Sequence, residues 1–188
     1  MYQLAQRTLL VLFSTLFLAA CGGETDTNEP DLDVPFYDRM VATITPTAES
    51  DVTGSVTFTR EQEGIRVIAT VSGLEPESLH GFHIHEFGDC SADDGTSAGG
   101  HYDPFGMPHS GPDNNQRHMG DLGNLVADEN GIATIDFYDS HLELDGDFTI
   151  LGRGVIVHAG EDDLESQPTG DAGARLGCGV IGVARTLQ

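Results

Sequence analysis

Alternation of apolar and polar residues with a period of two is the feature that most limits how this chain can fold. Such alternation places every second side chain on the same face of a strand, and β-branched residues strengthen the preference. No stretch longer than a few residues has the 3.6-residue apolar spacing of an amphipathic helix. The pattern therefore predicts an all-β domain, either a sandwich or a barrel. The candidate strands are residues 41–45, 54–59, 65–71, 81–85, 131–138, 154–158 and 179–184.

Two long segments do not alternate, residues 87–124 and 159–178. Loops of that length without secondary structure are uncommon unless they serve a function. Both segments are rich in Gly, Asp and His. We therefore expect the functional residues of the protein in and beside these two loops.

The N-terminus has the features of a processing segment. Residues 9–20 form a nearly unbroken apolar run, which at twelve residues is shorter than the ~20 that a spanning helix needs. Residues 1–20 are thus predicted to be a signal peptide. The residues Leu18-Ala19-Ala20-Cys21 resemble the bacterial lipobox, which implies cleavage before Cys21 and a lipid on its sulfur. An ordinary cleaved signal peptide that ends near a cysteine is the alternative.

This resemblance predicts a location in the cell envelope. The protein would face the periplasm on a membrane anchor, and Gly22 in place of an aspartate favours the outer membrane. Residues 21–38, acidic and without alternation, are predicted to be a flexible tether that follows the lipidated cysteine. Alternatively, residues 21–38 form the first loop of the domain. The domain itself is expected to span residues 39–188.

The charge of the chain is strongly negative. All 31 acidic residues follow Cys21, only Arg7 among the eight basic residues precedes it, and the chain contains no lysine. After cleavage, seven basic residues would face 31 acidic ones, a net charge of −24. Nucleic-acid binding is excluded because the chain has no basic patch that could displace counterions from phosphates. A solvated, soluble surface accounts for most of this acidity.

Histidines in and beside the two loops form a candidate metal centre. His83 and His85 lie two apart on a predicted strand, so their side chains share one face, where two rings could bind one ion. Taken alone, such a pair is more often a packing feature. Further histidines and an aspartate make a nitrogen-rich site the better interpretation, because imidazole suits zinc and copper and a carboxylate often completes a zinc shell. These further residues are His101, His109, His118, Asp121 and His158.

Four blocks of sequence resemble the signature blocks of the copper–zinc superoxide dismutase family. They are residues 81–89, 100–104, 117–124 and 173–182, in the family order, and the similarity covers roughly residues 41–184. The position of Cys90, five residues after His85, resembles the bacterial branch of the family. The resemblance implies an eight-stranded Greek-key β-barrel or sandwich with two long functional loops. It also implies an enzyme that converts superoxide to dioxygen and hydrogen peroxide through a copper redox cycle, with zinc as a structural and tuning ion.

Transferred position by position, the resemblance implies a role for each residue of the centre. Asp162 would orient one copper-ligand and one zinc-ligand histidine. Arg175 would hold the superoxide anion beside the copper, and His101, which bridges the metals, would take part in proton transfer. Copper would be bound by His83, His85, His101 and His158, and zinc by His101, His109, His118 and Asp121.

The remaining cysteines and histidines have simpler interpretations. If Cys21 carries a lipid, Cys90 and Cys178 remain as one pair, and the resemblance implies a disulfide between them. His80 is predicted to be a structural histidine that bonds to the backbone, and His141 to be a solvated turn residue. Two other functions stay open, a non-catalytic copper or zinc carrier and an adhesive surface lipoprotein. Partners are thus superoxide, a membrane and, as the family includes both dimers and monomers, a possible second copy.

Overall fold

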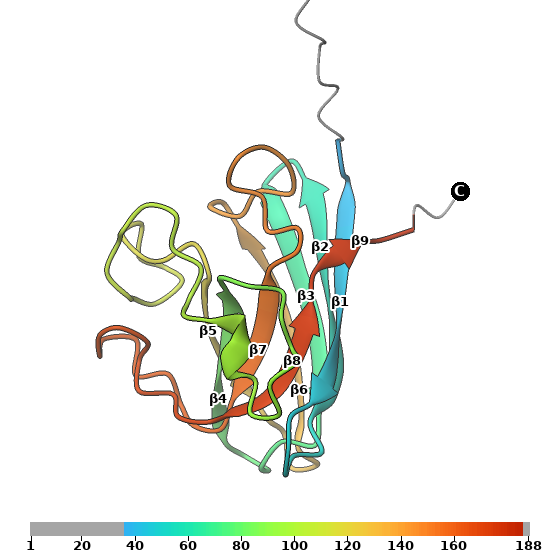
Figure 1. Ribbon diagram of the computed structural model, residues 1–188, viewed down its shortest axis with the longest axis vertical. Coiled ribbons are helices and arrows are strands. Elements are labelled where there is room, and N and C mark those ends of the chain that lie inside the picture. Colours follow the sequence, from blue (N-terminus) through green and yellow to red (C-terminus); the bar gives the residue numbers. More distant parts are fainter. Residues whose placement is uncertain (1–35, 186–188) are drawn as a thin grey trace, which may run out of the picture. The chain divides into compact units, whose positions relative to one another are not determined.

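Antiparallel strands make up nearly all of the regular structure (Figure 1). The computed structural model describes residues 36–185. The predicted signal peptide, Cys21 and all of the predicted tether except residues 36–38 therefore lie outside the described residues. Within residues 36–185, no helix is long and apolar enough to cross a membrane.

Eight strands follow one another in a single hydrogen-bonded path that curls into a nearly closed barrel (Figure 1). The order is β5-β4-β7-β8-β1-β2-β3-β6, and the short β9 pairs with β1. Pairing of β3 with β6 and of β4 with β7 joins strands that are not neighbours in sequence, as in a Greek key. The predicted all-β barrel is confirmed. The strands are β1 (Arg39–Pro46), β2 (Thr53–Glu61), β3 (Gly64–Ser72), β4 (Leu79–His85), β5 (Asp121–Val126), β6 (Ile132–Asp139), β7 (Gly154–His158), β8 (Arg175–Val180) and β9 (Gly182–Val183).

The barrel core follows from the alternation in the strands. In β3 the buried residues are every second one, from Ile65 to Val71, and β1 behaves in the same way. β4 is buried on both faces, because Phe82 and Ile84 point into the core while His83 and His85 point to the other face, which loops cover. The barrel therefore presents the two histidines on a face that is shielded from water.

The structure corrects the prediction at two strands. β5 (Asp121–Val126) was not predicted at all and begins inside the segment predicted as a loop, and β8 begins at Arg175, also inside a predicted loop. In β8 the cause is the pair Gly177 and Gly179, which a sequence pattern interprets as turn residues. A Cβ on Gly179 would lie 2.6 Å from the Thr43 carbonyl oxygen, so glycine is needed here because β8 packs closely against β1. The strand predicted at residues 179–184 is thus the end of β8 followed by β9.

A disulfide joins Cys90, in the loop after β4, to Cys178 on β8. It crosses 88 residues of sequence and ties the first long loop to the barrel. Cys178 packs with Ala98 and Ile156 in a small apolar cluster outside the main core. The predicted pairing is confirmed.

Candidate metal centre

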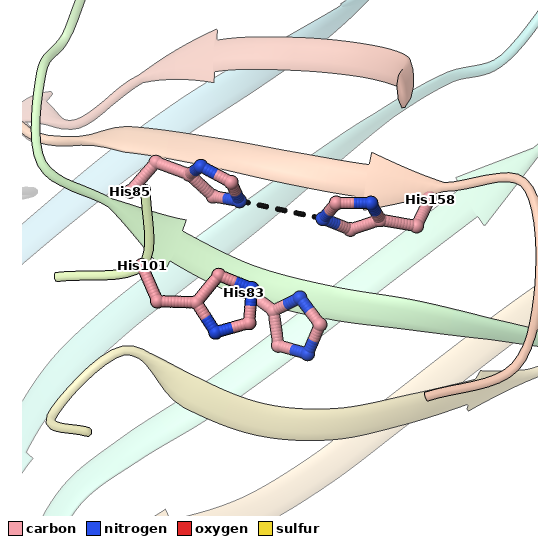
Figure 2. A group of neighbouring side chains, drawn as sticks. All are labelled: His83, His85, His101 and His158. Atoms are coloured by element: carbon pink, nitrogen blue, oxygen red, sulfur yellow. Dashed lines mark hydrogen bonds between the residues drawn. The ribbon is translucent and has the colours of Figure 1, made fainter. Parts of the chain in front are cut away.

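Two adjacent strands and one loop supply the first group of histidines. His83 and His85 project from β4, and His158 ends β7, which pairs directly with β4 (Figure 2). The loop reaches them through an isolated bridge between His85 and His101, next to a hydrogen bond from the Glu86 amide to the Gly100 carbonyl at 2.9 Å. The structure thereby brings together four rings from three separate parts of the sequence.

Hydrogen bonds at the outer edge of this group fix which ring nitrogens face inward. Carbonyl and carboxylate oxygens only accept, so the ring nitrogen that meets each of them must donate. His83 Nε2 donates to Asp162 Oδ2 at 2.8 Å, His85 Nδ1 to the Gly99 carbonyl at 2.9 Å, and His158 Nδ1 to the Gly173 carbonyl at 3.2 Å. In each neutral ring the other nitrogen then carries a lone pair. These three lone pairs belong to His83 Nδ1, His85 Nε2 and His158 Nε2.

The inward lone pairs need a cation. His85 Nε2 and His158 Nε2 lie 3.3 Å apart and face each other in Figure 2, although neither has a hydrogen left to donate. His83 Nδ1 and His101 Nε2 are buried without a hydrogen-bond partner. Buried polar atoms without partners are costly, and a metal ion bound by all four nitrogens would satisfy them. The four residues therefore fit a nitrogen-rich metal site.

A second group gathers around one carboxylate oxygen. Asp121 Oδ1 lies 2.8 Å from His101 Nδ1, 3.0 Å from His109 Nδ1 and 3.2 Å from His118 Nδ1. The ligand atoms within each group all lie within 4.8 Å of one another, and His101 belongs to both groups. Three imidazoles and a carboxylate form a tetrahedral set that suits zinc.

Burial keeps the first group of rings neutral. It lowers the pKa of His158 to about 3 and the pKa of His101 to about 4, and in both cases the charge of His83 adds to the effect. Burial also lowers the pKa values of His83 and His85. Neutral imidazole is the form that binds metals, so the protein presents these rings ready to coordinate.

The second group is dominated by its carboxylates. Burial acts to lower the pKa of His109, but its close contacts with the Asp121 and Asp162 carboxylates outweigh burial and raise the pKa to about 9. Burial acts to raise the pKa of Asp121, yet the three surrounding histidines hold that pKa far below its usual range. A cation among these groups is strongly favoured, whether it is a proton or a metal ion.

Asp162 connects the two groups. Besides its contact with His83, its Oδ1 accepts a hydrogen bond from His109 Nε2 at 2.9 Å. Asn124, on β5, holds the backbone of Asp162 at both polar atoms: its Oδ1 accepts from the Asp162 amide and its Nδ2 donates to the Asp162 carbonyl, each at 2.8 Å. The role of Asn124 is not apparent from the sequence, although the residue lies within one of the four blocks. Such contacts behind the ligands orient the rings.

Arg175, at the start of β8, lies beside the first group. Its Nη1 donates to the Gly95 carbonyl and its Nη2 to the Gly99 carbonyl, both at 2.7 Å. Burial lowers the pKa of its guanidinium below the usual value, and the nearby Asp94 opposes that change. No carboxylate of residues 36–185 lies within ion-pairing distance of this guanidinium, in contrast to Arg60, Arg66 and Arg117.

Two further histidines lie outside both groups. His80 is buried, and its Nδ1 donates to the His158 carbonyl at 2.9 Å, which agrees with its predicted structural role. The prediction of a solvated His141 was wrong in part: its side chain is only 32% exposed, and Arg117 Nη2 lies 3.3 Å from its Nδ1. The reason is that Arg117 reaches across from the first loop to the end of β6, where it also pairs with Asp139.

Comparisons with known proteins agree with this geometry. Residues 52–181 match the family described as copper/zinc superoxide dismutase. The chain is 49% identical to a copper–zinc superoxide dismutase of Paramecium bursaria Chlorella virus 1, over 73% of this chain and 76% of that protein. It is 46% identical to a copper–zinc superoxide dismutase of Yarrowia lipolytica (72% and 92%) and 43% identical to one of Arabidopsis thaliana (77% and 90%). With both ligand groups in place on the expected barrel, the chain belongs to the copper/zinc superoxide dismutase family.

Proposed function

We propose that this protein dismutates superoxide, converting two superoxide anions and two protons to dioxygen and hydrogen peroxide. The observation that carries this proposal is the pair of four-ligand groups that share His101. Copper in the first group would supply one-electron redox chemistry, while zinc in the second would supply a fixed positive charge without redox chemistry. The proposed copper ligands are His83, His85, His101 and His158, and the proposed zinc ligands are His101, His109, His118 and Asp121.

His101 has a position suited to proton transfer. Its Nδ1 faces Asp121, while its Nε2 is buried and unpartnered on the side of the first group. Because Nε2 is also the proposed copper-binding atom, it could hold a proton only while it is not bound to copper, and that proton would be next to the reacting anion and screened from bulk water. We therefore assign to His101 Nε2 the delivery of a proton to the reduced product.

Arg175 is proposed to bind the superoxide anion. Its two hydrogen bonds go to neutral carbonyls, which fix the guanidinium without neutralising it. The Gly99 carbonyl also accepts the bond from His85 Nδ1, so the arginine and a proposed copper ligand are held by one atom. A fixed cation at this place would attract an anion to the metal.

Anion guidance by Arg175 can be separated from the field of the whole protein. Because the net charge opposes superoxide, we expect the second-order rate constant of the wild type to stay level or rise as ionic strength increases to 0.15 M, where the Debye length is ~8 Å. Arg175→Gln should lower the rate constant by about tenfold at low ionic strength. Pulse radiolysis at several salt concentrations measures both effects.

Arg66→Gln is the matched control for this experiment, because it changes the net charge by the same amount. Arg66 lies on β3 and pairs with Asp136, outside the two long loops. The rate constant of Arg66→Gln should stay close to that of the wild type. A steep fall of the wild-type rate with added salt, or equal losses in the two variants, would contradict the assignment.

A scavenging assay on the copper- and zinc-loaded protein tests the function itself. A metal carrier would bind both ions without consuming superoxide, and an adhesive lipoprotein would need neither ion. Catalytic removal of superoxide that requires copper distinguishes the proposed enzyme from both. Stoichiometric copper binding without turnover would favour the carrier.

The proposed setting is the bacterial cell envelope. The lipobox-like residues 18–21 support a lipid on Cys21, with the enzyme facing the periplasm and protecting the envelope from superoxide. Fractionation of cells tests this proposal, since the full-length protein should sediment with membranes and be released by detergent. Recovery in the soluble fraction would exclude the anchor.

A homodimer is proposed through the face around Phe87 and Val180. The two residues are 55% and 44% exposed, and both belong to the exposed large apolar residues of the described chain. A Cβ on Gly88, the residue after Phe87, would lie 2.8 Å from Val180 Cγ1, so the loop after β4 packs directly against Val180 at the end of β8. We expect sedimentation of the wild type as a dimer at micromolar concentration and of Val180→Glu as a monomer. A monomeric wild type would refute this proposal.

A further inference from the structure

The side chain of Gln167 forms a two-point bridge to the backbone of His109. The His109 amide donates to Gln167 Oε1 at 2.8 Å, and Gln167 Nε2 donates back to the His109 carbonyl at 2.8 Å. The same Nε2 also donates to the Glu165 carbonyl at 3.1 Å, which fixes the amide group. The two residues are 58 positions apart, one in each of the two long loops. The bridge therefore joins the loops directly at a proposed zinc ligand.

His109 depends on this bridge for its main-chain position. Within residues 36–185, neither polar atom of its backbone forms a hydrogen bond to another backbone group. It lies in the stretch between Tyr102 and Asp121, which has no regular secondary structure. Its ring is held by Asp162, but its backbone is held by Gln167. Without the bridge, the amide and the carbonyl of His109 would both lose their partner, and the restraint left beside them would be the hydrogen bond from the Ser110 amide to Asp121 Oδ2 at 3.1 Å.

The loop that carries Gln167 is itself folded over the contact between His109 and Asp162. The Gly170 amide donates to the Ser166 carbonyl at 2.7 Å, and the Asp163 amide donates to the Gly170 carbonyl at 2.9 Å. Gly170 has a φ of 67°, and a Cβ there would lie 2.7 Å from His109 Nε2 and collide with Asp162. Only glycine allows the turn to approach so closely. Gln167 is thereby placed at a defined distance from His109.

We propose that Gln167 is a positioning residue that retains zinc by clamping the backbone of His109. Release of a bound ion requires its ligands to detach, and a ligand whose backbone is anchored cannot swing out of the group. The bridge makes no contact with the first group of histidines. Gln167 therefore acts on zinc retention rather than on copper. This inference rests on the zinc assignment in the proposed function.

Gln167→Met tests the clamp, because methionine has a similar length but forms neither hydrogen bond. In protein loaded with copper and zinc, we expect zinc to pass to a coloured chelator about tenfold faster than in the wild type, a size typical of contacts behind metal ligands. With Co²⁺ in place of zinc, the visible absorption bands should shift because the geometry at His109 relaxes. Copper content should be unchanged. Gln167→Asn, whose side chain is one methylene too short to span both groups, should show the same acceleration.

Gln62→Met is the control, since Gln62 is an exposed glutamine in the turn between β2 and β3. It should release zinc at the wild-type rate. Circular dichroism and thermal melting check that all variants remain folded. If zinc release and the Co²⁺ spectrum of both Gln167 variants match those of Gln62→Met, the clamp is refuted. A wild type that scavenges superoxide and binds zinc leaves the proposed function intact in that case, whereas a wild type that does neither refutes the proposed function itself.

Discussion

Replacing His158 with alanine is expected to abolish superoxide scavenging while the protein still binds zinc. His158 is buried at the end of β7, and its inward Nε2 is one of the four nitrogens of the first group. Its removal leaves three nitrogens and an open gap opposite His85 Nε2. The second group keeps all four of its ligands. We expect a loss of turnover on the order of a thousandfold or more, which is the scale for removal of an essential catalytic group.

The measurement combines rate and metal content. Scavenging is followed by competition with a superoxide-reducible dye, and the copper and zinc content of the same sample is determined by atomic spectrometry. His141→Ala provides the control, because His141 lies outside both groups. It should retain activity. Turnover by His158→Ala at a rate close to that of the wild type would mean that the first group is not the catalytic centre.

Removal of the disulfide is expected to have the largest effect on stability. Cys90 and Cys178 close a loop across 88 residues, for which the chain-entropy model gives ~4–5 kcal/mol in the free energy of unfolding. The double variant Cys90→Ala, Cys178→Ala should therefore unfold at a clearly lower urea concentration than the wild type. Both proteins should be compared without metals, because bound ions stabilise the folded state by mass action.

Treatment with a reductant separates the bond from the change of side chain. Reduced wild type should unfold near the midpoint of the double variant, while the reductant should leave the double variant unchanged. Equal urea midpoints for oxidised wild type and double variant would show that the bond contributes little to the folding equilibrium.

Much of the barrel was predictable because alternation is local. β1, β2, β3, β6 and β7 were all predicted within a few residues of their bounds, since each shows β-branched residues on a repeating face. β5 was missed entirely and the first part of β8 was missed as well, for different reasons. β5 begins with a buried aspartate, Asp121, and β8 contains two glycines that pack against β1. Both features are explained only by the segments that pack beside these strands in three dimensions, and the linear sequence does not reveal which segments those are.

In the candidate site, too, local patterns could be predicted from the sequence, whereas contacts between distant segments could not. Spacing alone indicated only that His83 and His85 share a strand face, and the grouping of the remaining ligands came from resemblance to a family. Gln167 and Asn124 could not be found in this way. Each acts through hydrogen bonds to the backbone of a residue at least 38 positions away, and their side chains carry no chemistry that marks them as functional. Their roles depend on how the two loops meet in space.

The Gly99 carbonyl has a consequence for how this enzyme can be altered. It accepts hydrogen bonds from both the His85 ring and the Arg175 guanidinium. Gly99 itself has a φ of 76°, and a Cβ on it would lie 2.7 Å from the Phe87 ring. Any change that shifts this peptide moves the proposed copper ligand and the proposed anion-binding arginine together. If these roles hold, substrate affinity and redox potential are coupled through one oxygen atom, and neither property can be tuned at this position without disturbing the other.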